Sequence, residues 1–383
     1  MKRSMYLMFS VLVLASLMLA ACAPAATPEP TAVPAPTDVP ATVAPAATDV
    51  PTEVPTVAAT VAAATAVPPT ATAAPAPVCA PLPTMPKVAA GKPGSSADNP
   101  IVITFVPSGD TGKITKAGTA IADCLAQMTG LAFKIEVGTS FAASIEAMGA
   151  EKAQVGFLNT FSVLLAEQKY QIVPALANLR KYNTNAVDPD ASLAGQMEPF
   201  YKGQFIASQA SGIKAFADLK GKTFCFVDPN STSGYIIPRI VLKAEGIDAD
   251  TDFKATQNAG SHNNVAIAVY KGDCDAGVTF IDVLTDSAAN LAATYPDIST
   301  KVTAFADTVR IPNDGVQYIK TLDPKVQAAI TDGLLAMAAD PGGQAVLKSL
   351  YSINGFQKID PTFYNDFAAV LKAAGVDPAE LVK

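Results

Sequence analysis

A low-complexity segment from about residue 23 to residue 99 sets the first limit on what this 383-residue chain can fold into. The segment consists mainly of Pro, Ala, Thr and Val, carries few charges and has no amphipathic period. A segment without such a period has no apolar face to bury, so we expect a disordered, partly extended linker over residues 22–99. The folded part is then residues 100–383, a length that favours two domains.

The N-terminus has the pattern of an export signal. Lys2 and Arg3 precede an uncharged apolar segment over residues 5–21, too short for a comfortable membrane span. We therefore expect a signal peptide over residues 1–21. Its Leu-Ala-Ala-Cys ending resembles a bacterial lipoprotein signal, which implies that Cys22 is lipidated and anchors an exported protein to a membrane, facing the periplasm or the outside. A plain signal peptide and an uncleaved anchor helix are the alternatives.

Four cysteines remain once Cys22 is assigned to lipid, and an even number in an exported protein indicates two disulfides with three pairings to choose from. We favour Cys225 with Cys274, which lie beside strands of one domain. The other pair is then Cys79 with Cys124, which would fasten the end of the linker to the fold. Free thiols are the alternative. The spacing fits no common zinc pattern, and a single histidine makes a metal site improbable, so we expect neither metal nor cofactor.

Strands alternate with helical segments along the folded part, a pattern typical of parallel-rich sheets with helices on both faces. Apolar, β-branched runs predict strands at residues 101–106, 133–137, 155–158, 223–227, 253–256, 277–281 and 316–319. Segments 198–208 and 303–311 are predicted to cross between two lobes, and residues 325–339 and 361–374 to be helical. We therefore expect an α/β fold with lobe 1 formed by residues 100–200 and 309–383, lobe 2 by residues 201–308, and a cleft between them.

Residues 228–235 read Asp-Pro-Asn-Ser-Thr-Ser-Gly-Tyr and follow the predicted strand 223–227. Asp-Pro-Asn is turn chemistry, and Pro238 suits the first turn of a helix. Unpaired backbone N–H groups, the helix dipole and clustered hydroxyls form a site for a small oxyanion. An ordinary helix cap is the alternative, because Ser and Thr are preferred there in any case.

Four stretches together resemble the phosphate/phosphite/phosphonate-binding proteins of ABC importers. They are residues 228–235, Gly-Ser-His-Asn-Asn at 260–264, Lys-Gly-Asp-Cys-Asp-Ala-Gly at 271–277, and Ile-Pro-Asn-Asp at 311–314. The resemblance covers most of residues 100–383 in order. It implies a class II periplasmic-binding-protein fold that closes over its ligand by hinge motion.

The resemblance also implies a set of ligand contacts. Donors to the oxyanion would be Ser231, Thr232, Ser233 and His262, with Asn159 and Thr160 in another ligand loop. Phe141 falls where the family often has a tyrosine that reaches the anion, so one donor is missing or is replaced by Thr139 or Ser140. For His262 the alternative is an ordinary residue at a helix start.

Two acids match positions near the ligand in the family. Asp314 would face a P–OH proton or an ammonium tail, and Asp282 lies where aminoalkylphosphonate binders have a second acid. A carboxylate beside a bound anion is repulsive unless a proton or a cation lies between them. A turn aspartate is the alternative for Asp314, and a helix cap is the alternative for Asp282.

Other functional classes fit the sequence less well. The net charge of −7 and the lack of an arginine-rich run argue against nucleic acid. Gly112 and Lys113 suggest a phosphate loop, but Pro107 and Ile114 occupy positions where that motif needs glycine and Ser or Thr. No nucleophile elbow appears either. We therefore expect a monomeric, lipid-anchored binding protein that passes a phosphorus oxyanion to a permease and its ATPase; a sensory module or an exported enzyme acting on small organic phosphates is the alternative.

Overall fold

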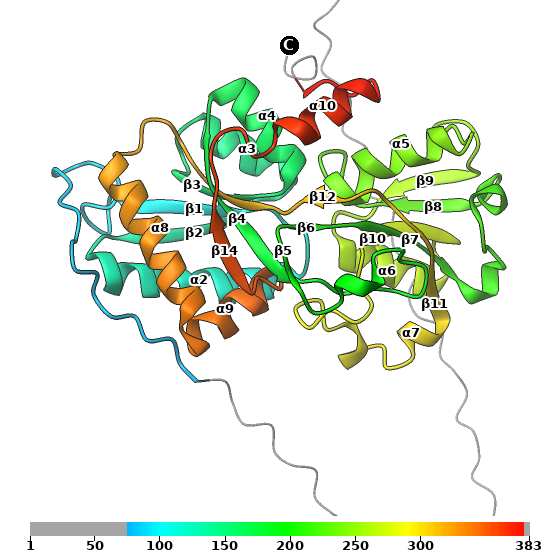
Figure 1. Cartoon of the computed structure of the whole chain (residues 1–383), viewed down its shortest axis with the longest axis horizontal. Helices are drawn as coiled ribbons and strands as arrows, with labels where there is room; N and C mark the ends of the chain where they lie inside the picture. Colours follow the sequence, from blue (N-terminus) through cyan, green and yellow to red (C-terminus); the bar gives the residue numbers. More distant parts are fainter. Residues whose placement is uncertain (1–74, 379–383) are drawn as a thin grey trace, which may run out of the picture. The chain divides into compact units, whose positions relative to one another are not determined.

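The computed structural model describes residues 75–378, which fall within one compact unit, Thr70–Lys383 (Figure 1). The predicted signal peptide, Cys22 and the linker up to residue 74 lie outside the described residues. None of the helices in residues 75–378 combines the length and the apolar character that crossing a membrane requires. The expected two-lobed α/β fold is confirmed, with one sheet at the centre of each lobe.

Lobe 1 surrounds a seven-stranded sheet with the order β14-β4-β13-β3-β1-β2, in which β5 pairs with β4. Its strands are β1 (Ile101–Phe105), β2 (Phe133–Val137), β3 (Val155–Leu158), β4 (Val173–Lys181), β5 (Met197–Glu198), β13 (Gly315–Tyr318) and β14 (Gly355–Lys358). β1 pairs in parallel with β2 and β3, whereas β13 and β14 add antiparallel pairs. The sheet is therefore mixed, because strands that return late in the chain extend its parallel part.

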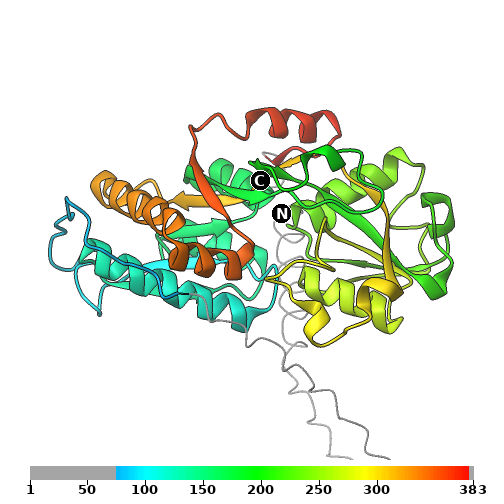
Figure 2. The ribbon, with the colours of Figure 1, turned by 60° about the horizontal axis from the view of Figure 1, so that its bottom comes forward.

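Helices cover both faces of this sheet, with α2 and α9 on one side and α3 and α4 on the other (Figures 1 and 2). The helices of lobe 1 are α2 (Thr111–Thr129), α3 (Phe141–Gly149), α4 (Thr160–Tyr170), α8 (Pro324–Ala339), α9 (Pro341–Tyr351) and α10 (Asn365–Ala373). α2 buries one face, which includes Ile114, Ile121 and Leu125, and ends at Gly130 in the left-handed conformation (φ 71°). Glycine adopts that conformation without a Cβ penalty, which explains why the helix ends there.

Lobe 2 surrounds a five-stranded sheet with the order β11-β7-β10-β8-β9. Its strands are β7 (Gly203–Ser208), β8 (Thr223–Phe226), β9 (Ala255–Asn258), β10 (Ala276–Phe280) and β11 (Val302–Asp307), and its helices are α5 (Ile237–Ala244), α6 (His262–Lys271) and α7 (Ile298–Lys301). β8 pairs in parallel with β9 and β10, and β7 runs antiparallel to β10 and β11. Two short strands, β6 (Phe200–Tyr201) and β12 (Ile311–Pro312), pair with each other where the chain passes between the lobes.

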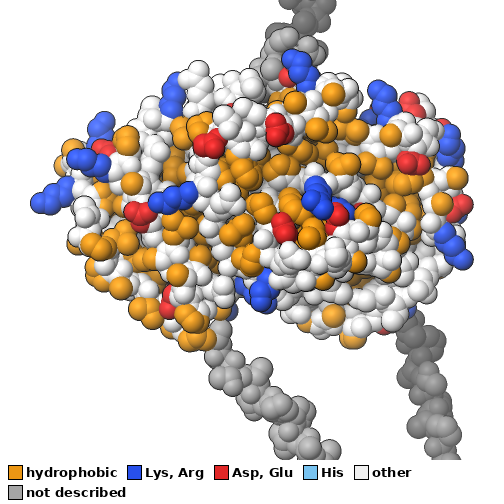
Figure 3. Space-filling model, in the orientation of Figure 1, with side chains coloured by type: hydrophobic (Ala, Val, Ile, Leu, Met, Phe, Trp, Pro, Cys, Tyr) orange, Lys and Arg blue, Asp and Glu red, His pale blue; other side chains and the backbone are white. Residues whose placement is uncertain are grey.

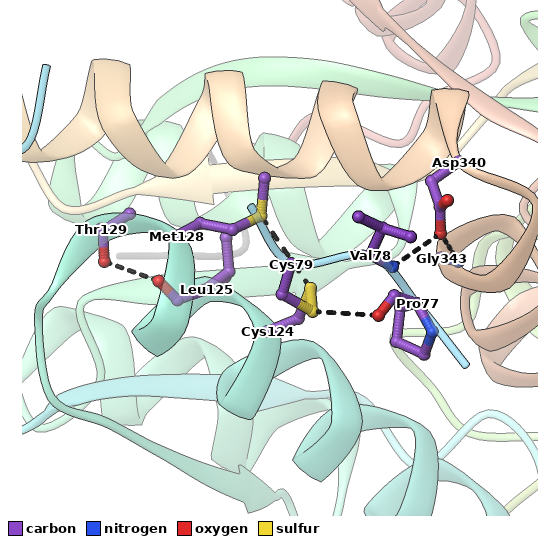
Figure 4. The surroundings of a disulfide bond; sticks show 9 residues. All are labelled: Pro77, Val78, Cys79, Cys124, Leu125, Met128, Thr129, Asp340 and Gly343. Atoms are coloured by element: carbon purple, nitrogen blue, oxygen red, sulfur yellow. Dashed lines mark hydrogen bonds between the residues drawn. A yellow bond between two sulfur atoms is a disulfide. The ribbon is translucent and has the colours of Figure 1, made fainter. Parts of the chain in front are cut away.

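Both disulfides pair the cysteines as the sequence predicted, Cys79 with Cys124 and Cys225 with Cys274. The first fastens residues 75–82 along α2, as Figure 4 shows. The backbone N–H of Val78 also donates to Asp340 (3.1 Å), and that of Leu82 to the carbonyl of Met128 (2.8 Å). The prediction of a disordered linker up to residue 99 was therefore wrong for residues 75–99, because a covalent bond and backbone hydrogen bonds hold this proline-rich segment to lobe 1.

Strand β4, helix α9 and strand β14 of lobe 1 were not predicted from the sequence. β4 contains Pro174, and a proline in an apolar run argues against a strand because it cannot complete the ladder. The structure accommodates it at a register shift in the pairing of β4 with β13. Asp340 alone separates α8 from α9 and caps the start of α9. In the sequence the two helices therefore resemble one interrupted apolar segment.

Acidic and basic side chains are interspersed on the face drawn in Figure 3, and that face shows no extended basic patch. Apolar atoms occupy much of the rest of this face. This face therefore offers no electrostatic footprint for a nucleic-acid backbone.

Candidate ligand-binding site

A cavity of about 70 Å³ lies between the two lobes and is lined by residues of both. It is large enough for several water molecules or one small ion. Of the residues predicted for the site, those that line it are Phe141, Asn159, Ser231, Thr232, Ser233, His262 and Asp314. The structure does not place Thr160 and Asp282 in the lining; each contacts a residue that is in it.

The stretch after β8 forms a cap and a short π-helix, Thr232–Ile236, that leads into α5. Ser231 is the N-cap, and its hydroxyl accepts from the backbone N–H of Gly234 (3.2 Å). A Cβ on Gly234 would lie 2.3 Å from a methyl group of Val227, so only glycine fits this turn. Ser231 therefore caps the helix, while Thr232 and Ser233 are buried at the cavity, and the oxyanion site stays a prediction.

Thr232 lies at the point where lobe 1 meets lobe 2. Its Oγ1 accepts from the side-chain amide of Asn159 (2.9 Å) and from the backbone N–H of Phe161 (2.8 Å), both at the start of α4. A hydroxyl has two lone pairs and one proton. With both lone pairs engaged, Thr232 keeps its proton as a donor in the cavity.

His262 begins α6 and is held as a neutral donor. Its Nδ1 accepts from the backbone N–H of Phe280 (3.1 Å), so the ring proton is on Nε2. Burial, with a smaller contribution from the charge of Arg180, lowers the pKa of His262 to about 3. The ring therefore stays uncharged at neutral pH and offers one N–H.

Arg180, at the end of β4, brings a positive charge to the cavity but shares it with lobe 2. Its Nη2 lies 3.4 Å from Asp282 Oδ1 and 3.5 Å from Asp286 Oδ2. Although burial acts to lower the pKa of Arg180, Asp282, Asp286 and Asp314 together raise it. Burial raises the pKa of Asp282. The cavity is lined by Asp286 and not by Asp282.

Asp314 is the acid of the predicted set that lines the cavity. Burial raises its pKa to about 6, against the opposing effects of Arg180 and Thr160. The hydroxyl of Thr160 donates to the carbonyl of Pro312 (2.6 Å) and lies 3.4 Å from Asp314 Oδ1. Near neutral pH this carboxyl group can therefore either accept from a ligand or carry a proton toward it.

The raised pKa of Asp314 predicts a pH-dependent stability of the ligand-free protein. Between the unfolded pKa near 3.8 and the folded pKa near 6, the folded state binds more protons, so ionisation of Asp314 lowers stability as pH rises. Asp314→Asn should therefore increase the free energy of unfolding at pH 8, by up to about 3 kcal/mol, and have little effect at pH 4. Urea unfolding at both pH values measures this difference.

Asp98→Asn serves as the control, because Asp98 is exposed and far from the lobe boundary in sequence. It should change stability by less than about 0.5 kcal/mol at both pH values. An Asp314→Asn protein whose stability differs from that of the wild type by the same amount at pH 4 and pH 8 would contradict the assignment.

Three charged or phenolic residues that line the cavity, Arg180, Asp286 and Tyr201, were not predicted for the site from the sequence. Arg180 lies on the strand that was missed, and Asp286 follows Asp282 in a loop without a motif. Tyr201 is on a crossing strand, lines the cavity and lies beside the hydroxyls of Ser233 and Thr232. Its phenol and the ring of Phe141 both line the cavity, which only a three-dimensional structure reveals.

No group of His, Cys, Asp and Glu within residues 75–378 has the arrangement of a metal site. The cavity instead presents hydroxyls, amides, a neutral imidazole, one shared guanidinium and the side chain of Lys113. Such a set of donors can hold a small anion by hydrogen bonds, and the acids beside it can accept hydrogen bonds from the same molecule.

Comparisons with known proteins agree with this geometry. The family model for the periplasmic substrate-binding protein of phosphonate ABC transporters matches residues 103–364. The chain is 27% identical over 192 residues to the phosphate-import protein PhnD of Mycolicibacterium smegmatis, which covers 49% of this chain and 56% of that protein. It is 30% identical over 166 residues to the phosphonates-binding periplasmic protein of Escherichia coli, which covers 42% and 47%. The alignments thus span about half the length of these curated relatives.

Solved structures share the fold. A binding-protein component of an ABC phosphonate transporter from Pseudomonas aeruginosa superposes with a TM-score of 0.60 at 21% identity, covering 73% of this chain and 96% of that one. PhnD1 of Prochlorococcus marinus, solved in complex with methylphosphonate, gives a TM-score of 0.60 at 16% identity, covering 72% and 98%. Because the family model spans most of the described residues, the chain belongs to the periplasmic substrate-binding proteins of phosphonate ABC transporters.

Proposed function

We propose that this protein captures a small phosphorus oxyanion, a phosphonate, phosphite or phosphate, and delivers it to the permease and ATPase of an ABC importer. The protein acts as a lipid-anchored monomer, held outside the cytoplasm through Cys22, and makes or breaks no bond in its ligand. The observation that carries the proposal is the hydroxyl of Thr232, which lines the cavity and accepts two hydrogen bonds, so that its proton is what it can offer to a ligand.

The proposed ligand contacts come from both lobes. Thr232 and Ser233 donate their hydroxyl protons to the oxyanion, His262 donates from Nε2, and Tyr201 adds a phenol. Asn159 orients Thr232. Binding of one anion at the lobe boundary favours the closed state, because the donors meet only when the lobes are together.

The acids define which ionic form binds. Arg180 is already shared between two carboxylates, and Asp314 adds a further negative charge when it ionises. A fully ionised anion would be repelled by Asp314, whereas a ligand with a P–OH proton or an ammonium group can donate to it. We therefore propose a monoprotonated oxyanion or an aminoalkylphosphonate as ligand.

Calorimetry and thermal unfolding of the purified protein test the function. Methylphosphonate, phosphite, phosphate and aminoethylphosphonate are compared with sulfate, which has the same shape but no proton at neutral pH. At a concentration about 100 times its Kd, a true ligand should stabilise the protein by about 2.7 kcal/mol, and sulfate should stabilise it far less. The proposal is abandoned if none of the four phosphorus compounds binds, or if sulfate binds as tightly as they do.

A further inference from the structure

Lys113 has a position that helix stability does not explain. It lies in the first turn of α2, three residues after the N-cap Asp110. A cation in the first turn opposes the helix dipole. Its ammonium group crosses the cleft instead and donates to the backbone carbonyls of Ala288 and Ala289 in lobe 2, at 3.0 Å each. Lys113 therefore ties the two lobes together with a charged donor.

The loop that receives Lys113 is held in place by the cavity itself. Oδ1 of Asp286 accepts from the backbone N–H groups of Ala288 (2.9 Å) and Ala289 (2.8 Å). Oδ2 of Asp286 faces Arg180 and accepts from the hydroxyl of Ser352. The carboxylate of Asp286 therefore holds both the loop with these two carbonyls and the side chain of Arg180 in the cavity. The position of the carbonyls that Lys113 contacts thus depends on the contacts made inside the cavity.

Lys113 also stands between two hollow regions. It lines the cavity and an outer groove of about 450 Å³, and so do Gly109, Asp110, Asn263 and Ala289. The outer groove includes Thr139 of lobe 1 and Tyr295 of lobe 2, so it follows the same boundary between the lobes toward the surface. The residues common to both regions form a neck, and Lys113 is the side chain that bridges it.

We propose that Lys113 closes the mouth of the cavity, and thereby limits the size of the phosphorus ligand and slows its release. This inference rests on the proposed function. A methyl substituent fits within the closed cavity, whereas a phenyl substituent must pass through the neck into the outer groove and displace the ammonium group. Lys113 is therefore a specificity-determining residue, in addition to the residues that contact the oxyanion.

The test compares methylphosphonate and phenylphosphonate binding to the wild type and to Lys113→Met, which keeps an unbranched apolar stem without the charge. Loss of a charged donor shared by two carbonyls should speed release of methylphosphonate by about 10- to 100-fold in stopped-flow displacement. The ratio of phenylphosphonate to methylphosphonate affinity should rise by about tenfold or more in calorimetry. Lys116→Met, exposed on the same helix and in neither lining, should behave as the wild type.

The outcomes separate the two ideas. If Lys113→Met keeps both the release rate and the affinity ratio within about twofold of the wild type, the closing role of Lys113 is overturned while the proposed function stands. If the wild type binds neither phosphonate, nor phosphite or phosphate, the proposed function and this inference are both overturned.

Discussion

Thr232→Val is expected to lower the affinity for methylphosphonate by about 1000-fold, because valine has the shape of threonine but neither donates nor accepts. The loss has two sources. The ligand loses one charge-assisted hydrogen bond, at a cost of roughly 1.5–3 kcal/mol. In the closed state, the backbone N–H of Phe161 also loses its acceptor, and the amide of Asn159 keeps only the carbonyl of Asn230 (2.9 Å). Calorimetry measures the total.

Thr232→Ser provides the matched control, since it keeps the hydroxyl and removes only a methyl group. It should stay within about tenfold of the wild type. Unfolding of the ligand-free valine variant should change little by comparison, because open lobes let water hydrate the two freed donors. A Thr232→Val protein that binds methylphosphonate within about threefold of the wild type would show that this hydroxyl does not contact the ligand.

Some of the atoms proposed to bind the ligand also join the two lobes. Thr232 joins the lobes through Asn159 and Phe161, and the backbone N–H of His262 donates to the carbonyl of Ser108 in lobe 1 (3.0 Å). Lys113 and Arg180 add contacts from lobe 1 to the loop after β10. A ligand shifts a conformational equilibrium only through its differential affinity for the two states. On the proposed function, that difference would arise because the donors converge from both lobes onto one ligand.

The parts that could be predicted from sequence are those that depend on local pattern. Strand β8, the turn after it and the helix with an early proline follow from residues 223–238 alone, and glycine at 234 marks a turn that no larger residue fits. The alternation of strands and helices then predicts which loops meet, since the carboxyl ends of parallel strands share one edge of a sheet. The predicted cavity residues that follow parallel strands are Phe141, Asn159, Ser231, Thr232, Ser233 and His262. Asp314 instead precedes the antiparallel strand β13, and only the resemblance to the family indicated it.

The parts that could not be predicted depend on distant partners. Strand β4, which carries Arg180, was not predicted because it contains Pro174. The register shift that accommodates this proline is visible only in the paired sheet. Asp282 matched a ligand acid by position, but pairing with Arg180 is a contact between residues 102 apart in the chain. Long-range ion pairs of this kind leave no mark in the local sequence. Arg180 pairs with Asp286 as well, so local pattern does not indicate that Asp286, and not Asp282, lines the cavity.

Arg180→Gln is expected to have the second large effect, because it removes the cation between two lobe 2 carboxylates. Breaking a buried ion pair by deleting one partner costs about 3–5 kcal/mol. The lobes can avoid that cost by opening, so water hydrates Asp282 and Asp286. The closed state should therefore become rare, and the apparent affinity for methylphosphonate should fall in proportion to its population, by about 100-fold or more. Calorimetry gives the affinity, and small-angle scattering of the ligand-free protein should show a larger radius of gyration.

Arg239→Gln is the control for this change, since Arg239 forms an ion pair of the same chemistry with Asp250 (2.6 Å) at an exposed site in lobe 2. Exposed pairs contribute at most about 1 kcal/mol, so this variant should bind and scatter as the wild type does. Combining Arg180→Gln with Asp282→Asn tests the reason for the loss, because it removes one of the carboxylates left without a cation. Partial recovery of the compact state and of affinity would assign Arg180 a role in holding the lobes together. A compact double variant that still fails to bind would assign it to the oxyanion itself, and an Arg180→Gln protein with wild-type affinity would exclude both roles.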